Sequence, residues 1–210
     1  ATHAPNIKMV RIGTRQVVQS PDKFDESLYD FFSSLKNRFQ FEIACQINHP
    51  FELQDITRNI LLNLQAAGCR IYSQNVLLKG VNDNIDTLVE LYDELRYLGI
   101  TPHYFFHAVP MKGTDDFRTT VLKGLELIKE LTSKGELSGR AKPQYALMTD
   151  IGKVTLYHDS IVRREGAYWI IKTAFKLEDR LKWNPYYELP SSAITNDDGT
   201  LSVKYLDGRE

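Results

Sequence analysis

The chain has 210 residues, of which 42% are hydrophobic and 25% are charged, and its formal net charge is −1. This near-neutral balance gives no bulk electrostatic reason to expect a nucleic acid or an anionic membrane as a partner. No apolar run approaches the roughly 18 residues of a membrane span, and the length suits one domain with a full core.

Cysteine usage indicates a reducing compartment. Cys45 and Cys69 are the only cysteines, and they form no metal-binding or redox motif. No signal peptide is visible in the sequence. We therefore expect a cytoplasmic protein with two reduced, buried thiols.

The first part of the chain alternates strand-like and helix-like segments at intervals of roughly 30 residues, as βα units of parallel sheets and barrels do. Strands are expected at 8–12, 39–47, 71–78 and 104–107, and helices at 24–35, from Ile56 to a cap at Gly68, from Ile85 to Gly99, and at 117–131. Active sites of such folds lie at the carboxyl ends of the strands. The segments to inspect are therefore 11–15, 46–49, 78–83 and 107–112.

The pattern changes after Gly135. Short strands are expected at 145–148, 154–157 and 168–172, a helix at 175–183, and turns with two weak strands up to residue 210. We expect residues 1–135 to form the βα repeats and residues 136–210 to form a C-terminal extension packed on them. The fold class is α/β, a partial (βα) barrel of the TIM type with parallel strands. Four units fall short of a closed barrel, so we expect a piece of a longer polypeptide.

The first strand ends in Arg11 and Arg15, which flank Gly13. Two arginines near a glycine suit an anionic group such as a carboxylate or a phosphate. The same pattern also fits a pair of exposed surface cations.

The next two strands carry amide and imidazole groups. Gln46, Asn48 and His49 precede a proline at the second strand end, and Gln74 lies in an apolar strand where an amide needs a partner. Each of these residues also has an ordinary structural interpretation. We expect the strands to bring Arg11, His49, Gln74 and His107 to one rim. The sequence has no P-loop, no GxGxxG, no defensible catalytic triad and no zinc spacing among its histidines.

Several segments match one family in order and at near-family spacing. These segments are 10–15, 48–50, 74–84, 117–119, 124–126, 138–139 and Pro143. Together they resemble the lysine 2,3-aminomutase family of radical S-adenosylmethionine (SAM) enzymes, over roughly residues 7–153. The segment 74–84 is the most specific.

The resemblance implies a partial barrel of six βα units, of which the four strands above would be the third to the sixth. It also implies an isomerase in which a [4Fe-4S] cluster cleaves SAM to a 5′-deoxyadenosyl radical. That radical takes a hydrogen from an amino-acid substrate held as an imine on pyridoxal phosphate (PLP), and the amino group moves to the adjacent carbon.

Family roles are carried over by position only. Gln74 falls on a glutamine that contacts SAM in the family, Gln46 falls where the family often has a histidine, and Asn48 and His49 match an Asn-His-Pro turn. Lys153 is the candidate for the lysine that forms the PLP Schiff base. The predicted cofactor-binding residues are Arg11, Arg15, Gln46, Asn48, His49, Gln74 and Lys153, with Lys153 also as the catalytic residue; no residue is predicted to bind a metal.

The chain departs from the family in three places. The cysteine motif that binds the cluster is absent, so we expect the isolated chain to be inactive and unable to bind the cluster. The family's two lysine-binding aspartates fall on Val109 and at or near Met148, although a small gap would place Asp150 there, so free lysine is not the expected substrate. The glycine-rich run before Lys153 is shortened to 150–152, which bears on PLP binding.

Two other functions stay open. One is a catalytically inert, isolated half-barrel domain. The other is a stand-alone barrel enzyme that acts on a phosphorylated metabolite through Arg11, Arg15 and Lys79. Because a truncated barrel exposes the edge of its first strand, we expect residues 7–12 at an open sheet edge or at a contact with another chain, for example in a homo-oligomer.

Overall fold

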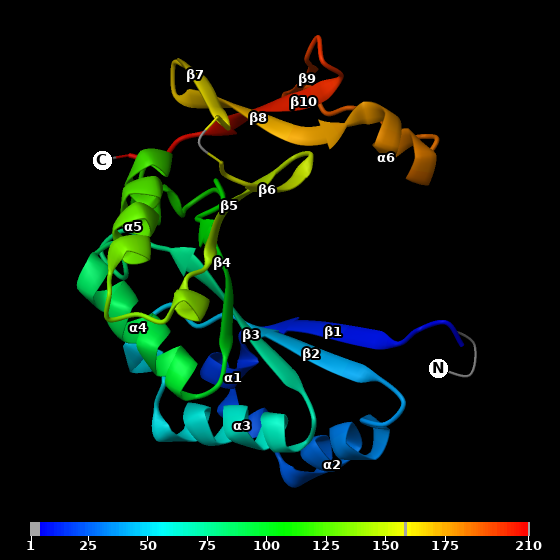
Figure 1. Cartoon of the computed structure of the whole chain (residues 1–210), viewed down its shortest axis with the longest axis vertical. Coiled ribbons are helices and arrows are strands. Elements are labelled where there is room, and N and C mark those ends of the chain that lie inside the picture. The colour runs from blue at the N-terminus through cyan, green and yellow to red at the C-terminus, as the bar shows by residue number, and fades with distance from the viewer. Residues whose placement is uncertain (1–4, 158, 210) are drawn as a thin grey trace.

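The computed structural model describes residues 5–157 and 159–209. It contains two sheets, a six-stranded sheet in the order β1-β2-β3-β4-β5-β6 and a four-stranded sheet in the order β7-β8-β10-β9. The first sheet curves, its helices lie on its outer side, and the second sheet lies across one end of it (Figure 1).

The six-stranded sheet is a partial (βα) barrel. Strands β1 to β5 run parallel, and β6 returns antiparallel to β5. The strands are β1 Met9–Thr14, β2 Gln40–Cys45, β3 Arg70–Leu77, β4 Thr101–His107, β5 Gln144–Thr149 and β6 Gly152–Thr155. The helices are α1 Gln16–Gln19, α2 Glu26–Leu35, α3 Asp55–Ala66, α4 Ile85–Tyr97 and α5 Val121–Ser133, with short 3-10 turns at Pro21–Lys23, Pro50–Glu52, Asp115–Phe117 and Gly139–Ala141.

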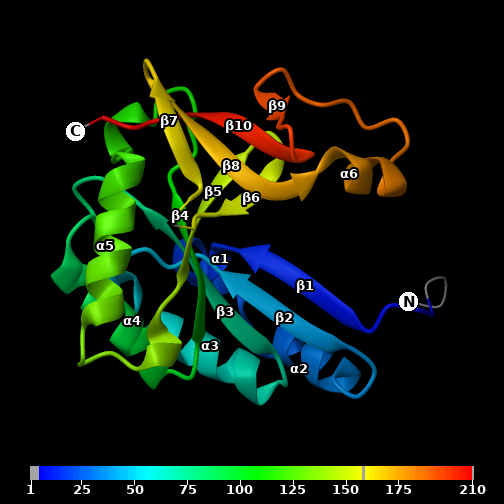
Figure 2. The same cartoon turned by 45° about the horizontal axis from the view of Figure 1, so that its top comes forward.

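Amphipathic helices explain why the outer side of the sheet is covered. Phe41 and Ile43 of β2 are buried in the same apolar core as Ile60 and Leu64 of α3, and the ring centroid of Phe41 lies 5.0 Å from that of Phe32 on α2. Side chains at helix N-termini accept backbone hydrogen bonds, as Asn84 does from the N–H of Thr87. Figures 1 and 2 both place α2 to α5 on this outer side, which leaves the inner face of the sheet open.

Most predicted elements match observed ones within a few residues, but α1 and the strand Ile161–Glu165 were not predicted. Three further differences concern the barrel. Strand β4 begins at Thr101 rather than at residue 104, because Pro102 is accommodated where the ladder between β3 and β4 shifts register. Helix α5 begins at Val121 rather than at residue 117, because the hydroxyl of Thr120 caps it. Strands β5 and β6 belong to the barrel sheet, so the sheet continues beyond the boundary expected at residue 135.

The second sheet is antiparallel and is built from β7 Ile161–Glu165, β8 Tyr168–Lys176, β9 Ala193–Thr195 and β10 Thr200–Leu206, with α6 Leu177–Trp183 after β8. A buried polar junction attaches it to the barrel. The fully buried Arg118 donates hydrogen bonds to the carbonyl oxygens of Ala108, Leu206 and Asp207. The Asp207 carboxylate accepts from the N–H of Val121 and from the indole N–H of Trp169, both at 2.8 Å.

Strand β1 lies at the edge of the barrel sheet, as expected for residues 7–12. It pairs only with β2 among the described strands, and Ile7, Met9 and Ile12 nearby are exposed apolar side chains. This open edge agrees with a barrel that does not close.

Candidate active site

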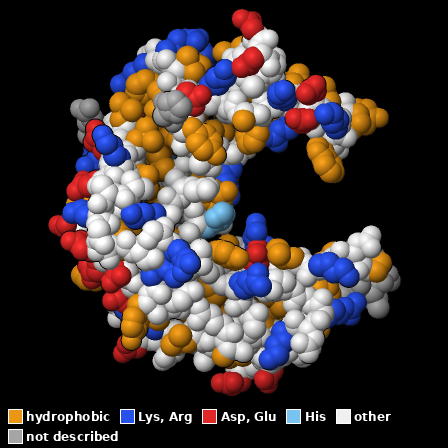
Figure 3. All heavy atoms as spheres, in the orientation of Figure 1, with side chains coloured by type: hydrophobic (Ala, Val, Ile, Leu, Met, Phe, Trp, Pro, Cys, Tyr) orange, Lys and Arg blue, Asp and Glu red, His pale blue; other side chains and the backbone are white. Residues whose placement is uncertain are grey.

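The inner face of the barrel forms an open cleft of about 790 Å³. The space-filling view shows the molecule hollowed between the barrel sheet and the arm formed by β8 and α6 (Figure 3). The lining residues are Gly13, Thr14, Arg15, Ala44, Gln46, Gln74, Val76, Leu78, Val81, Phe106, His107, Ala108, Val109, Met111, Thr114, Phe117, Met148 and Lys153. Most lie on or shortly after β1 to β5, whose carboxyl ends converge as the sequence predicts, while Lys153 lies near the amino end of the antiparallel β6.

Lys153 projects from β6 into this cleft. Its Nζ lies 4.0 Å from the ring centroid of Tyr104 and 5.0 Å from that of Phe106, both on β4. No ion pair to a carboxylate is formed by Lys153 within the described residues. Burial, and secondarily the charge of Arg11, lower the pKa of Lys153 below its usual value. A lysine in this setting is easier to deprotonate and is therefore a better nucleophile.

Arg11 lies on the same face of the sheet but below the cleft, two residues before the lining residue Gly13. Its Nε donates to Oε2 of the buried Glu42 at 2.8 Å, directly across the β1–β2 ladder. The Tyr72 hydroxyl donates to the other oxygen of Glu42 at 3.4 Å. Arg11 therefore acts on Lys153 through its charge. Its partner is Glu42, a residue that was not predicted from the sequence. The signal was present, because Glu42 is a charged residue within an apolar strand.

Arg15 follows β1 and lines the cleft. Its Nη2 donates to Oε1 of Glu52 at 2.8 Å. Its Nη1 is buried and has no hydrogen-bond partner among residues 5–157 and 159–209. Gln46 and Gln74 line the same cleft and are half-buried. These three polar side chains come together as predicted from the strand ends.

Asn48 and His49 do not line the cleft. Asn48 is buried, and its Oδ1 accepts from the N–H of Val76 at 2.9 Å. His49 uses its Nδ1 to accept from the N–H of Phe51 at 3.1 Å. One side-chain atom of each residue therefore holds the turn at Pro50–Glu52 or the end of β3, and a direct contact of either residue with a cofactor stays a prediction.

His107 borders the cleft, but its side chain is fully buried. Its Nε2 donates to the carbonyl oxygen of Thr119 and its Nδ1 accepts from the Tyr205 hydroxyl, both at 2.8 Å. Burial lowers the pKa of His107 to about 4, so the ring is neutral near pH 7. The expected rim of Arg11, His49, Gln74 and His107 is thus realised only in part. Gln74 and His107 line the cleft, but the ring nitrogens of His107 are already bonded, so Gln74 is the one of these four whose side chain has polar atoms available there.

The cleft lining contains no acidic side chain among the described residues. Val109 and Met148 line it, as do the apolar side chains of Met111 and Phe117. Lys153 and Arg15 are its cations. This distribution does not suit a ligand group with a positive charge, because an ammonium removed from water needs an acidic partner.

The described residues also contain no group of three or more histidine, cysteine or acidic side chains arranged to hold a metal ion. Cys45 and Cys69 are free and buried. Burial raises the pKa of the Cys45 thiol to about 12 and that of Cys69 to about 11, so both stay protonated near neutral pH. Protonated, buried thiols do not fit iron ligation.

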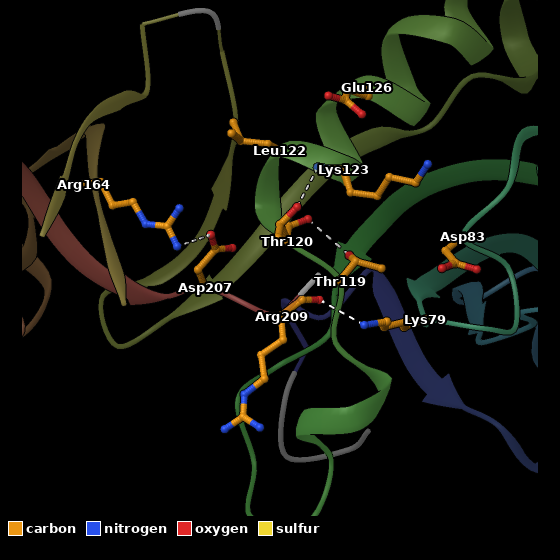
Figure 4. A pocket seen from close by; sticks show the side chains of 10 residues that line it. All are labelled: Lys79, Asp83, Thr119, Thr120, Leu122, Lys123, Glu126, Arg164, Asp207 and Arg209. Carbon is orange, nitrogen blue, oxygen red and sulfur yellow. Dashed lines mark hydrogen bonds and ion pairs between the residues drawn. The ribbon is translucent and has the colours of Figure 1, made fainter. Parts of the chain in front are cut away.

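A second pocket of about 370 Å³ lies at the start of α5 (Figure 4). It shares no lining residue with the cleft, and its cations Lys79, Lys123, Arg164 and Arg209 alternate with Asp83, Glu126 and Asp207. Lys79 therefore does not join Arg11 and Arg15, and the three-cation site proposed for a phosphorylated metabolite is not assembled.

In the part of the chain that the structure describes, no helix has the length and apolar character that crossing a membrane requires. No model of a known protein family matches the chain.

Three curated relatives are all named as 2,3-aminomutases. A putative L-lysine 2,3-aminomutase from Aquifex aeolicus (strain VF5) is 35% identical over 168 residues, covering 78% of this chain and 44% of that protein. Another from Treponema pallidum (strain Nichols) is 38% identical over 144 residues, covering 69% of this chain and 39% of that protein. A glutamate 2,3-aminomutase from Clostridioides difficile (strain 630) is 31% identical over 181 residues, covering 83% of this chain and 42% of that protein. The chain therefore spans less than half the length of these relatives.

Among solved structures, a radical SAM methyltransferase from Sphaerobacter thermophilus matches 56% of this chain and 38% of its own, with a TM-score of 0.36 and 20% sequence identity.

Proposed function

We propose, from the relation of this chain to the lysine 2,3-aminomutase family, that it forms part of an isomerase that moves an amino group between adjacent carbons of an amino acid. The reaction proceeds by radical chemistry with SAM, a [4Fe-4S] cluster and PLP, as the resemblance implies. Because the chain covers less than half of its relatives, this activity belongs to the whole protein rather than to the chain alone.

The observation that carries the proposal is the placement of Lys153. The amine lies in the cleft, has two aromatic rings beside it, and has a lowered pKa. When bound, PLP supplies an imine linkage to an amino group and spreads charge and spin over its ring. Lys153 is the residue that holds it, while Tyr104 and Phe106 shield the linkage from water.

Gln46 and Gln74 supply the polar contacts for SAM in this proposal. Both are half-buried in the cleft lining, Gln46 directly after β2 and Gln74 on the neighbouring β3, and each amide offers both a donor and an acceptor. The described residues do not fit the cluster, because Cys45 and Cys69 are buried, protonated thiols. The proposal therefore places the cluster ligands outside these residues.

The proposed substrate is not free lysine. The cleft lining has no acidic side chain among the described residues, and Val109 and Met148 are apolar. A substrate with an uncharged side chain suits this lining, since no buried ammonium is then left without a partner.

The proposal predicts that PLP attaches selectively to Lys153. After incubation with PLP and reduction with borohydride, peptide mass spectrometry should find the reduced adduct on Lys153 at a lower PLP concentration than on any other lysine. The Lys153→Ala variant should lose the imine absorbance, and the Lys79→Ala variant, which removes an amine from the second pocket, should keep it.

Equal labelling of many lysines, or an imine band that persists in Lys153→Ala, would contradict the assignment. Neither result would follow from misfolding alone if the two variants have the same unfolding midpoint as the parent chain.

A further inference from the structure

Lys153 directly follows a very short turn. Thr149 of β5 and Gly152 of β6 are cross-strand partners. Asp150 and Ile151 alone lie between these partners along the chain. Gly152 has a φ of +108°, a conformation that residues with a side chain rarely adopt. Because Lys153 comes next, the conformation of the turn sets the direction in which the lysine side chain leaves β6.

Two residues beyond β8 contact this turn. Arg180 on α6 donates from its Nη2 to the carbonyl oxygen of Ile151 at 2.7 Å. The Ser192 hydroxyl, just before β9, donates to the Asp150 carboxylate at 2.5 Å. Figure 1 shows the hairpin of β5 and β6 ending beside the point where β8 leads into α6. The segment after β8 therefore fixes the loop that precedes Lys153.

Arg180 is itself held in one orientation. Its guanidinium carbon lies 4.6 Å from the ring centroid of Phe175 on β8 and 6.0 Å from that of Tyr187. Among residues 5–157 and 159–209, Arg180 forms no ion pair with a carboxylate. A planar guanidinium stacks on aromatic rings and keeps its N–H donors in its own plane, a geometry that an ammonium lacks. The stacked side chain therefore presents its Nη2 to the turn.

The orientation of Lys153 matters because its side chain lines two cavities. One is the cleft, and the other is a neighbouring pocket of about 460 Å³ between β6 and β8. In the structure the amine lies 4.0 Å from the ring centroid of Tyr104 and 5.0 Å from that of Phe106, which lines the cleft. A lysine side chain has many rotamers, so a turn that is free to move would let the amine leave these rings.

We propose that Arg180 is a positioning residue for Lys153. It acts through the carbonyl oxygen of Ile151, and the contact between Ser192 and Asp150 supports the same turn. The inference rests on the proposed function, in which Lys153 holds PLP in the cleft. It assigns a role to the segment after β8, which directs the amine toward the aromatic rings of β4.

Ring-current shifts measure where the lysine lies. In a chain labelled with 13C at the lysine ε-carbons, the ε-protons of Lys153 should resonate upfield, because the end of the side chain lies over Tyr104. The signal is assigned by its absence in Lys153→Ala. Arg180→Met keeps an apolar stem but removes the donor, so it should move the signal toward that of an exposed lysine. The matched control is Lys182→Met, which breaks an exposed ion pair with Asp179 on the same helix and should leave the signal unchanged.

Two further variants separate the contact from the charge. Arg180→Lys keeps the charge but loses the planar donor, so it should restore the upfield shift only in part. Ser192→Ala removes the second contact, leaves Arg180 in place, and should reduce the shift even if Arg180→Met does not fold. An unchanged signal in Arg180→Met or in Ser192→Ala, full restoration in Arg180→Lys, or an equal change in Lys182→Met would overturn the proposal.

Trapping of PLP connects the position of the amine to the proposed function. Arg180→Met should need a several-fold higher PLP concentration than the parent chain for half of Lys153 to be labelled, and Lys182→Met should not. The NMR measurement does not involve PLP, so the two failures can be told apart. A shift that depends on Arg180 without labelling of Lys153 would contradict the proposed function alone. Normal labelling with a shift that is independent of Arg180 would contradict the positioning role alone.

Discussion

At the scale of single residues, the charge of Arg11 and the aromatic surroundings of Lys153 set the chemistry of the cleft. Burial is the larger cause of the lowered pKa of Lys153, and the positive charge of Arg11 is the second. Arg11 stays ordered because Glu42 holds its Nε, so the neighbouring charge has a fixed position. The same two cations, Lys153 first and then Arg11, add to the burial that lowers the pKa of His103.

This arrangement predicts that Arg11→Gln raises the pKa of Lys153 towards its ordinary value. A nearby positive charge disfavours the protonated amine, so removing it favours protonation, while burial keeps part of the shift. The pKa is measured from the pH dependence of Lys153 modification by trinitrobenzenesulfonate, with Arg163→Gln as the control for loss of a paired arginine. An unchanged or lower pKa in Arg11→Gln would show that Arg11 does not act on Lys153.

The sequence identified some of these residues and missed others for physical reasons. Arg15, Gln46 and Gln74 were found because polar residues at parallel strand ends converge, whereas Lys153 was identified only through the family resemblance. Glu42 and Tyr104 were missed, because a pattern along one strand does not reveal the register that brings Glu42 opposite Arg11. Asn48 was predicted as a ligand contact, yet its side chain satisfies a backbone group, which no local pattern distinguishes.

At the scale of elements, β10 is attached to β4 through His107. The Tyr205 hydroxyl on β10 donates to the imidazole, and the imidazole donates to the Thr119 carbonyl oxygen before α5. The bond from Tyr205 requires the neutral ring, because only an unprotonated Nδ1 can accept it, whereas the bond to Thr119 persists in either protonation state. Because burial lowers the pKa of His107 from 6.5 to about 4, protonation in the folded state is unfavourable.

We therefore predict a loss of stability as the pH falls from about 6.5 to about 4. The His107 contribution is fully present above the unfolded pKa and is lost as the pH approaches the folded pKa, with a limit of about 3 kcal/mol for a shift of this size. Urea unfolding at about pH 7 and about pH 4.5 measures it, and His107→Gln should flatten the difference.

Tyr205→Phe is the matched control for that prediction. It removes the hydroxyl that donates to His107 but keeps the buried titrating ring, so it should lower stability at about pH 7 and keep the part of the pH dependence that burial causes. If the free energy of unfolding of His107→Gln fell between about pH 7 and about pH 4.5 as much as that of the parent chain, the acid sensitivity would belong to other groups.

The elements also show what periodicity predicts well and poorly. The helices and the first three strands were located because their apolar faces repeat regularly. The partner of β5 was not predictable, because a short apolar run of five or six residues suits a barrel strand and an extension equally well. Arg118 was matched only to a family motif, although it binds three carbonyl oxygens across the junction between the sheets.

At the scale of the whole molecule, the partial barrel with an α/β architecture was predictable, because repeated βα units allow few topologies. The second sheet was predicted only in part: a strand was expected at 168–172 and two weak strands up to residue 210, but β7 was not expected, and the attachment depends on a polar junction rather than on a hydrophobic pattern. The open edge at β1 was predicted because the units are too few to close a barrel.

The whole molecule is also the scale for the iron–sulfur prediction. Anaerobic reconstitution of this chain with iron and sulfide should give substoichiometric iron, because both thiols are buried and protonated. The iron content should be the same in the Cys45→Ser/Cys69→Ser double variant, and chemical iron and sulfide assays measure it. One cluster per chain, lost in the double variant, would refute the prediction.

The junction at Asp207 also gives the protein an intrinsic optical reporter. The chain has two tryptophans, and their surroundings differ. The indole of Trp169 on β8 donates to Asp207, which also accepts from Val121 at the start of α5, whereas Trp183 is 90% exposed. In a Trp183→Phe variant, all tryptophan fluorescence would come from Trp169 beside Asp207. A change in that fluorescence would then report separation of the second sheet from the barrel without an added dye.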